Sequence, residues 1–167
     1  WVDHPDYDDY WKWLAVEERY GDIKVPVLQI GGWYDFFAAG TLANFMGMRD
    51  RGGSDLARNH QRAIVGPWVH AASTLTHAGD VDFGKASMLD LPSIELRWFD
   101  HWLKGQANGA KGDAPLQLFV MGVNQWRDER EWPLARARPT PYYFRSGGSA
   151  NSLLGDGRLS TTPAGEE

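Results

Sequence analysis

Two short segments of the sequence place an ionisable side chain directly after a run of apolar and β-branched residues. Asp35 ends the segment Gly-Gly-Trp-Tyr-Asp, and His70 ends the segment Gly-Pro-Trp-Val-His. An aspartate that accepts a hydrogen bond from one imidazole nitrogen fixes the tautomer of the ring and stabilises its protonated form. The other ring nitrogen is then free to take a proton from a nucleophile. The two residues are therefore a candidate acid and base for nucleophilic catalysis, provided that the fold brings them together.

The elements that must position them are two predicted strands of a parallel sheet. Residues 23–30 form a near-continuous apolar run that ends at Gly31–Gly32, and residues 62–66 form a second, shorter run. Such runs, flanked by glycine, are typical of strands buried on both faces. Residues that follow neighbouring parallel strands lie at the edge of the sheet where ligands bind in open α/β folds. The 35 residues from Asp35 to His70 leave room for one helix and one strand.

Helical spacing of apolar residues predicts the elements that accompany these strands. Residues 41–48 carry one such pattern, which Gly52–Gly53 ends. A loop is expected over residues 71–89. Residues 92–104 then carry a longer amphipathic pattern, with Gly105 as its C-cap. The order strand, helix, strand, helix predicts an α/β fold with a parallel sheet.

The composition of the chain changes near residue 105. Residues 105–115 are rich in Gly, Ala and polar residues, which predicts a linker. Beyond them, short predicted strands lie at residues 115–122, around Trp126–Arg127 and at residues 140–146, with turns about every ten residues. This spacing is typical of an antiparallel sandwich. We therefore expect a domain boundary within residues 105–115 and a second domain that is cut short.

Composition and charge exclude several classes of function. The 167 residues are 43% hydrophobic, which allows a buried core, and the net charge of −5 argues against a nucleic-acid binder. The absence of cysteine excludes disulfides, thiolate metal sites and a cysteine nucleophile. No apolar run approaches the ~20 residues of a membrane helix, so a membrane protein is not expected. Residue 1 is Trp and no signal-peptide pattern follows, so we interpret the chain as part of a longer protein and favour the cytoplasm over export.

These segments resemble those of the Xaa-Pro dipeptidyl-peptidase-like serine hydrolases of the cocaine esterase (CocE/NonD) family. The matching blocks cover most of residues 1–144 in the family's order: VPVLQIGGWYD, RAIVGPWVH, ELRWFDHWLKG and LFVMGVNQWRDEREWP. The resemblance implies an α/β-hydrolase core with a helical cap insertion, followed by a C-terminal jelly roll. It also implies that Asp35 is the catalytic acid and His70 the catalytic base of a Ser-Asp-His triad.

The resemblance divides the chain into three regions. Residues 1–20 would end the cap and return to the core, residues 21–105 would form the C-terminal part of the hydrolase core, and residues 106–167 would form a linker and a truncated jelly roll. The implied substrate is a small-molecule ester or amide, or an Xaa-Pro peptide, cleaved without cofactor or metal; self-association is left open. The nucleophile elbow Gly-x-Ser-x-Gly is absent. We therefore expect the serine and the oxyanion hole upstream, and no turnover by this chain alone.

Aromatic residues beside the two candidates predict the walls of a substrate pocket. They are Trp33, Tyr34, Phe36, Phe37 and Trp68. Family members that act on α-amino acid esters carry carboxylates two and three residues after the catalytic Asp, and the corresponding residues here are Phe37 and Ala38. The substitution favours an apolar or neutral acyl group over one that bears an ammonium. The alternative, that Phe36 and Phe37 simply pack in the core, stays open. For Trp33 and Trp68 we favour the interpretation that they wall the core beneath the site over a role of the indole N–H in orienting a loop there.

A second hypothesis treats the chain as a non-catalytic binding module. In this reading Trp126, Trp132, Tyr142 and Tyr143 form a carbohydrate- or protein-binding surface on a β-sandwich, with the α/β part as scaffold. His77 is a rival to His70 as the base, although it lacks the Gly-Pro-Trp segment before it. Hydrolysis of p-nitrophenyl esters by the intact protein would distinguish an enzyme from a binding module.

Overall fold

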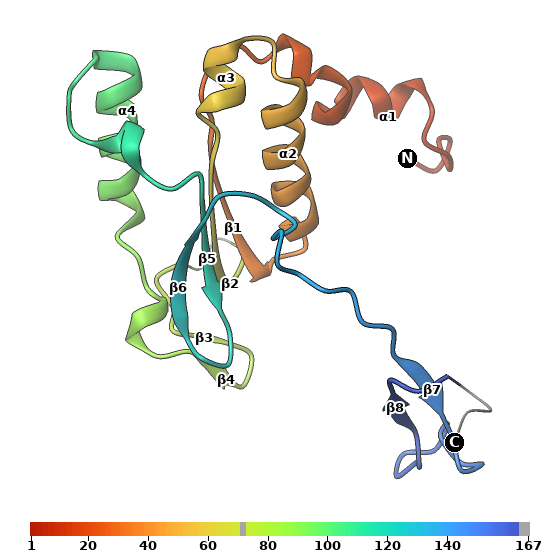
Figure 1. Cartoon of the computed structure of the whole chain (residues 1–167). Helices are drawn as coiled ribbons and strands as arrows, with labels where there is room; N and C mark the ends of the chain where they lie inside the picture. The colour runs from red at the N-terminus through yellow and green to blue at the C-terminus, as the bar shows by residue number, and fades with distance from the viewer. Residues whose placement is uncertain (71–72, 164–167) are drawn as a thin grey trace. The chain divides into compact units, whose positions relative to one another are not determined.

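The computed structural model describes residues 1–70 and 73–163, which form parts of two compact units, Trp1–Leu134 and Ala135–Glu167. The first unit contains a four-stranded sheet in the order β1-β2-β5-β6 (Figure 1). Its strands are β1 (Leu28–Tyr34), β2 (Arg62–Val69), β5 (Leu116–Val120) and β6 (Gln125–Glu129). The pairs β1–β2 and β2–β5 are parallel, and β6 returns antiparallel to β5.

Helices cover both faces of this sheet. The helices α2 (Ala38–Arg51) and α3 (Asp55–Asn59) connect β1 to β2, and α4 (Leu91–Lys104) lies between β2 and β5 in the chain. Figure 1 shows α2 and α4 on opposite sides of the strands. Crossover helices of this kind are what parallel strands require, and they bury the sheet on both faces.

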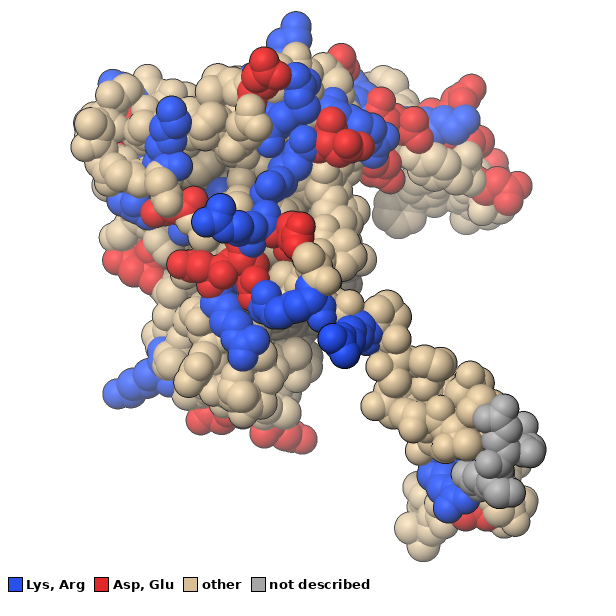
Figure 2. Space-filling view, in the orientation of Figure 1, with Lys and Arg blue, Asp and Glu red and all other residues tan. Residues whose placement is uncertain are grey.

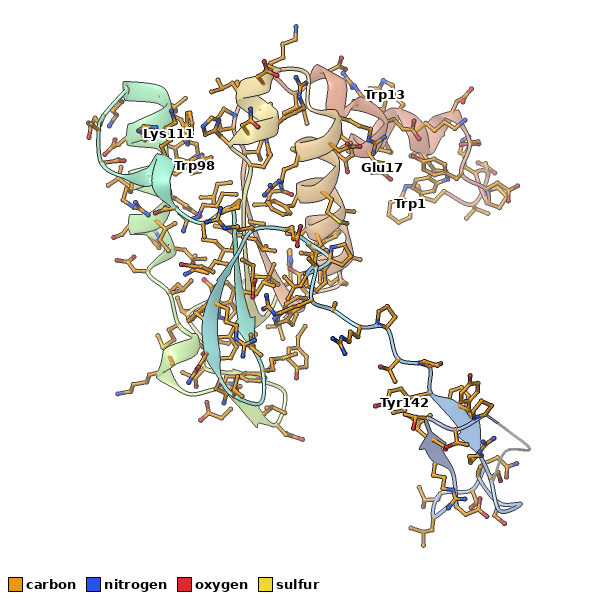
Figure 3. The ribbon with its side chains drawn as sticks, viewed as in Figure 1. Trp1, Trp13, Glu17, Trp98, Lys111 and Tyr142 are labelled. Atoms are coloured by element: carbon orange, nitrogen blue, oxygen red, sulfur yellow. The ribbon has the colours of Figure 1, made fainter. Side chains whose placement is uncertain are left out.

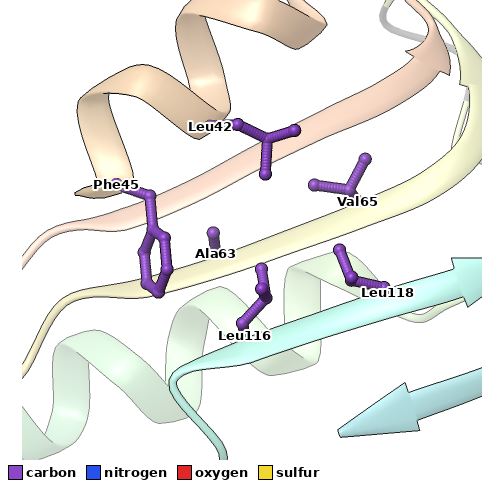
Figure 4. Close-up of a cluster of buried hydrophobic side chains, with 6 residues drawn as sticks. All are labelled: Leu42, Phe45, Ala63, Val65, Leu116 and Leu118. Atoms are coloured by element: carbon purple, nitrogen blue, oxygen red, sulfur yellow. The ribbon is translucent and has the colours of Figure 1, made fainter. Parts of the chain in front are cut away.

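The central strand β2 packs against the helices on both faces of the sheet. Seven of its eight residues are buried, and their side chains alternate between the two faces. Ala63 and Val65 pack in a cluster with α2, whereas Ile64 packs with Leu91 at the start of α4. Figure 4 shows the first cluster, which consists of Leu42, Phe45, Ala63, Val65, Leu116 and Leu118.

The ends of α4 are set by residues that the sequence pattern identifies. The Asp90 side chain accepts a hydrogen bond from the backbone N–H of Ser93, and Pro92 occupies the first turn. Gly105 ends the helix in the left-handed conformation with φ of 70°. The predicted helix over residues 92–104 is therefore confirmed.

The remaining elements are short. At the N-terminus they are α1 (Asp9–Leu14) and the 3-10 helix η1 (Val16–Asp22). Between β2 and α4 lie β3 (His77–Ala78), β4 (Val81–Asp82) and η2 (Lys85–Ser87), and η3 (Ala110–Gly112) precedes β5. The elements β3, β4 and η2 are short interruptions of the loop that we expected over residues 71–89, of which residues 71–72 lie outside the described residues. The second unit contains an antiparallel pair, β7 (Tyr143–Arg145) and β8 (Arg158–Ser160).

Two features differ from the sequence-based expectation. The first predicted strand begins later and continues through Gly31–Gly32, because these glycines pair with Val65 and Gly66 of β2 instead of ending the strand. Their lack of a side chain lets Gly31 lie close to Thr41 of α2 and Gly32 close to Trp68 of β2. The compact unit also extends beyond the expected boundary at residues 105–115 to Leu134. The physical reason is that β5 pairs in parallel with β2, so it extends the α/β sheet and does not open a separate sandwich. Within the described part of residues 135–163, the sheet consists of β7 and β8 alone, which does not define a jelly roll.

Among the described residues, no helix has the length and apolar character needed to cross a lipid bilayer.

Candidate active site

The strands β1 and β2 are in close contact at Gly32, just before the two candidate catalytic residues. Gly32 is paired with Gly66, and the register shifts by a bulge before Tyr34 pairs with Val69. A Cβ atom on Gly32 would lie only 2.1 Å from the carbonyl oxygen of Trp68. The absence of a side chain at Gly32 therefore lets the ends of both strands meet, and it brings the residues that follow them to one edge of the sheet.

The backbone N–H, the backbone carbonyl and the side chain of Asp35 all make hydrogen bonds. Its own N–H donates to the carbonyl of Gly32 at 3.1 Å, and its carbonyl accepts from the N–H of Ala38 at 3.0 Å. Its side-chain oxygen Oδ1 accepts a hydrogen bond from the backbone N–H of Phe37 at 2.9 Å. This Asx-type turn fixes the carboxylate at the start of α2 and leaves Oδ2 for another partner.

His70 supplies that partner. Its Nδ1 lies 3.0 Å from Oδ2 of Asp35, and the Asp35 side chain is 10% exposed while the imidazole is 53% exposed. An ionised carboxylate only accepts hydrogen bonds, so Nδ1 carries the proton in this pair and Nε2 is left with a free lone pair. The structure thus brings together the two residues that the sequence pattern singles out, and the half-exposed imidazole presents Nε2 as a proton acceptor.

The pKa of the Asp35 carboxyl is lowered from its ordinary value. The largest cause is the hydrogen bond from the Phe37 backbone. Burial opposes it and is the second-largest effect, and the hydrogen bond and the charge of His70 each lower the pKa further. Asp35 is therefore ionised at neutral pH, as an aspartate that orients a histidine must be.

A cavity of about 240 Å³ adjoins the pair. Besides Asp35 and His70, it is lined by Ile30, Gly31, Gly32, Trp68, Val69, Ser73 and Leu91. The ends of both strands and the start of α4 thus form its walls. Neither Ser73 nor Leu91 is marked by any motif, and only the fold brings them here.

The five predicted pocket aromatics have different environments. Trp68 lines the cavity, although it is almost fully buried and its indole N–H donates to the Ser87 carbonyl at 3.0 Å. Phe36 and Phe37 do not line the cavity but flank the imidazole, with ring centroids 5.1 and 5.3 Å from that of His70. Their side chains are exposed, so the alternative that they pack in the core does not hold.

Trp33 and Tyr34 are not brought to the cavity. The Trp33 indole N–H donates to the carbonyl of Phe119 at 2.8 Å, and its ring packs against Trp132 beside the core cluster on the α2 face. Tyr34 is instead in ring contact with Phe83. Because successive side chains of a strand point to opposite faces, closeness to Asp35 in sequence does not place them beside it in space.

Two of the aromatic residues of the binding-module hypothesis, Trp126 and Trp132, pack against other rings of the first unit. Trp126 packs against Trp68 and Phe119 and donates its indole N–H to Ala86, and Trp132 packs against Trp33. Both belong to the first unit, whereas Tyr142 and Tyr143 lie in the second. His77 lies in the short strand β3 and pairs there with Asp82, and it does not line the cavity beside Asp35.

Among the described residues, no group of three or more His, Asp or Glu side chains is placed to hold a metal ion. His4, which lies in an acidic segment, has a single carboxylate partner there, with Nδ1 2.6 Å from Oδ2 of Asp8.

The parallel strands, the helices on both faces and the Asp–His pair at the strand ends are consistent with part of an α/β-hydrolase core. Comparisons with known proteins identify the family. The sequence profile of the X-Pro dipeptidyl-peptidase (S15 family) matches residues 1–72, which include both Asp35 and His70. Cocaine esterase from Rhodococcus sp. (strain MB1 Bresler) is 37% identical over 99% of this chain and 28% of its own length.

Two crystal structures show the same fold. An aminopeptidase from a marine sediment Thaumarchaeota archaeon has a TM-score of 0.70 at 21% identity, over 88% of this chain and 24% of its own. A CocE/NonD family hydrolase from Staphylococcus aureus has a TM-score of 0.58 at 20% identity, over 86% of this chain and 23% of its own. The chain belongs to the family of S15 X-Pro dipeptidyl-peptidases and CocE/NonD hydrolases, which are serine hydrolases. It spans about a quarter of the length of these relatives.

Proposed function

We propose that this chain supplies the acid and the base of a serine hydrolase that cleaves an ester or an amide by acyl transfer. The observation that carries the proposal is the hydrogen bond of 3.0 Å between His70 Nδ1 and Asp35 Oδ2, at the carboxyl ends of neighbouring parallel strands. Family membership supports the same chemistry. The nucleophilic serine would come from a part of the protein outside these 167 residues.

The proposed reaction proceeds in two halves. A serine Oγ attacks the substrate carbonyl carbon while His70 Nε2 takes its proton, and the imidazolium then gives that proton to the leaving alcohol or amine as the acyl bond breaks. In the second half, water attacks the acyl-enzyme and His70 repeats the same two transfers, which releases the acid and the serine. Throughout, Asp35 holds the Nδ1–H and stabilises the positive charge that forms on the ring.

The surroundings of His70 favour a substrate whose acyl group carries no charge. Phe36 and Phe37 border the imidazole with their exposed rings, and neither they nor Ala38 offers a carboxylate for a substrate ammonium group. Such rings bind apolar groups by burial of surface, and they attract a cation only weakly. We therefore propose neutral or apolar acyl esters and amides as the preferred substrates.

The test uses the full-length protein and the variants Asp35→Asn and His70→Gln. We expect kcat/KM for p-nitrophenyl butyrate to fall by about 10³-fold or more in each variant. In Asp35→Asn the imidazole is no longer held in the tautomer that leaves Nε2 free, and in His70→Gln the imidazole is absent. Labelling of the serine by a fluorophosphonate probe should fall in parallel. The folded state, followed by circular dichroism, should be retained, because both substitutions keep a polar side chain of similar size and lie at the end of the sheet, outside the buried core clusters.

The matched control is His77→Gln, which removes an exposed histidine of β3 outside the cavity. This variant should hydrolyse the ester at the wild-type rate. Near-normal turnover by Asp35→Asn, or a comparable loss in His77→Gln, would remove the Asp35–His70 pair from the mechanism. A higher kcat/KM for a p-nitrophenyl ester of an α-amino acid than for the butyrate would contradict the proposed acyl preference alone.

A further inference from the structure

The imidazole that we propose as the base is half-exposed and has one hydrogen-bonded partner. The Nδ1 of His70 lies 3.0 Å from Oδ2 of Asp35. A side chain at the surface can leave such a contact for other staggered rotamers, in which water satisfies its N–H. A general base acts only within hydrogen-bond reach of the proton that it takes. The rate therefore depends on how often His70 is in the rotamer that binds Asp35.

Two phenyl rings contact this imidazole. Figure 2 shows Lys and Arg side chains gathered over the middle of the visible face of the first unit, with Asp and Glu side chains among them. His70 has a different environment: within the described residues it has one ion pair, with Asp35, and its ring contacts are with Phe36 and Phe37. Beyond Asp35, the contacts that can hold the imidazole there are therefore contacts with aromatic rings.

The three rings form a compact cluster. The centroid of the imidazole lies 5.1 Å from that of Phe36, at an interplanar angle of 38°, and 5.3 Å from that of Phe37, at 67°. The two phenyl centroids are 4.2 Å apart, so both phenyl rings lie on the same side of the imidazole. Tilted and edge-to-face ring pairs at such distances attract each other. An imidazole that swung away from Asp35 would lose these ring contacts together with the hydrogen bond.

The phenyl rings and the carboxylate are carried by one anchored segment of backbone. The Phe37 N–H donates to Oδ1 of Asp35. The Phe37 carbonyl accepts hydrogen bonds from the backbone N–H and the hydroxyl of Thr41, at 2.9 and 3.1 Å, and the Thr41 side chain lies against Gly31 of β1. The turn is therefore tied to both α2 and β1, and it presents Oδ2 and the two rings to the imidazole in a fixed relation.

We propose that Phe36 is a positioning residue of the hydrolase: its ring, together with that of Phe37, holds the His70 imidazole in the rotamer in which Nδ1 is bound and Nε2 can take the proton of the serine. This inference rests on the proposed function of His70 as the base. Phe36 is the residue to test, because Phe37 also closes the turn through its backbone, whereas the Phe36 ring is 76% exposed and can be replaced without opening the core.

The experiment uses two variants of the full-length protein. Phe36→Leu keeps an apolar side chain but removes the ring, and Phe36→Tyr keeps the ring. We expect Phe36→Leu to lower kcat about threefold to tenfold, the factor that corresponds to the free energy of one aromatic contact. The factor should be the same for p-nitrophenyl acetate, butyrate and hexanoate, with KM nearly unchanged, because a positioning ring affects every substrate. Phe36→Tyr should retain the wild-type kcat.

The matched control is Trp13→Leu, which removes another exposed aromatic ring. Trp13 lies on α1 and is 74% exposed (Figure 3). This variant should hydrolyse all three esters with the kcat and KM of the wild type. Circular dichroism should show that all three variants are folded.

The proposal is overturned if Phe36→Leu hydrolyses the acetate with the wild-type kcat. A loss that appears only with the longer acyl chains belongs to this case, because the ring would then be a pocket wall. The proposal is also overturned if Phe36→Tyr or Trp13→Leu loses as much kcat as Phe36→Leu. Failure of the proposed function is a different result, in which His70→Gln itself stays active. Wild-type kcat in Phe36→Leu beside an inactive His70→Gln would refute the positioning role alone.

Discussion

At the scale of single residues, the two carboxylate oxygens of Asp35 accept hydrogen bonds from different partners. Oδ1 is bound by the Phe37 backbone and Oδ2 by the His70 imidazole. The first hydrogen bond depends only on the course of the chain, so it holds the carboxylate in place whatever the state of the histidine. The second then presents a fixed acceptor to Nδ1. We infer that the turn at residues 35–37 makes the Asp–His geometry a property of the fold.

The lowered pKa of Asp35 gives a prediction on stability at acid pH. A carboxyl group whose pKa is lower in the folded than in the unfolded state adds stability that is fully present above the unfolded pKa of ~3.9. That contribution is lost as the pH falls through the folded pKa. Between pH 6 and pH 3, the thermal midpoint of the wild-type protein should therefore fall more steeply than that of Asp35→Asn, and the gap between them should narrow.

The measurement is thermal unfolding of the full-length wild-type and Asp35→Asn proteins side by side. Their difference gives the contribution of Asp35 alone, because other aspartates with lowered pKa, such as Asp82 and Asp90, are present in both proteins. A gap between the midpoints that stays constant or widens towards pH 3 would contradict the assigned direction of the pKa shift.

At the scale of elements, the approach of β1 to β2 depends on a residue without a side chain. Gly32→Ala should destabilise the protein by about 1–3 kcal/mol, because the new Cβ would overlap the Trp68 carbonyl and push the strands apart. Esterase activity should fall as well, since Asp35 and His70 are carried by those two strand ends. Urea unfolding and ester hydrolysis of the full-length protein measure the two effects.

The matched control for this variant is Gly40→Ala in α2, where a new Cβ would meet no atom within 4 Å. It should stabilise the protein by about 0.4–1 kcal/mol, because alanine restricts the unfolded chain and favours the helix. If Gly32→Ala were as stable and as active as Gly40→Ala, the close contact at Gly32 would have no role in positioning the site.

Local sequence patterns predict the main helices and strands of the first unit, but they do not predict which sheet the strand β5 joins. The apolar spacing of α4 and its Gly105 cap lead directly to the observed helix, and the apolar run of β2 leads to the central strand. The run at β5 looks the same whether the strand joins a sandwich or extends a parallel sheet. Its place beside β2 is decided by packing of Leu116 and Leu118 against α2, which is a long-range contact that no local pattern contains.

The same limit applies to the candidate site. Asp35 and His70 could be predicted because each follows a strand within a specific motif, and the structure brings them together. Ser73 and Leu91 could not be predicted, since they reach the cavity only through the path of the chain between β2 and α4. Trp33 is a pocket candidate by its place in the motif, but its side chain packs beside the core cluster, as the favoured interpretation expects, because the pleat of β1 directs it to the face that α2 covers.

At the scale of the whole chain, part of the apolar surface has no cover among the described residues. β1 is at the end of its sheet, so its outer edge pairs with no described strand. On α4, the side chains of Leu96, Phe99 and Leu103 are 60%, 50% and 77% exposed, although its other face is packed on the sheet. Open strand edges and exposed apolar patches are surfaces through which chains associate.

We therefore expect these 167 residues, expressed by themselves, to self-associate and to bind the dye ANS. Light scattering after size-exclusion chromatography and dye fluorescence are the measurements. The double variant Phe99→Gln/Leu103→Gln should reduce both signals, whereas Leu153→Gln, a fully exposed residue of the second unit, should reduce them less. If the 167 residues were instead a monodisperse monomer that does not bind ANS, the exposed face of α4 and the edge of β1 would not be association surfaces.

The indole hydrogen bonds that brace the strand ends also have a practical consequence. Trp33 and Trp68 each lie two residues before a member of the Asp35–His70 pair, and each donates its ring N–H to a carbonyl distant in sequence, of Phe119 and Ser87. Indole protons resonate apart from the backbone amides, so among the nine signals of ¹⁵N-labelled tryptophan, that of Trp68 would report on the cavity wall and that of Trp33 on the packing beneath the end of β1. Occupancy of the site could then be followed in solution without attaching any probe.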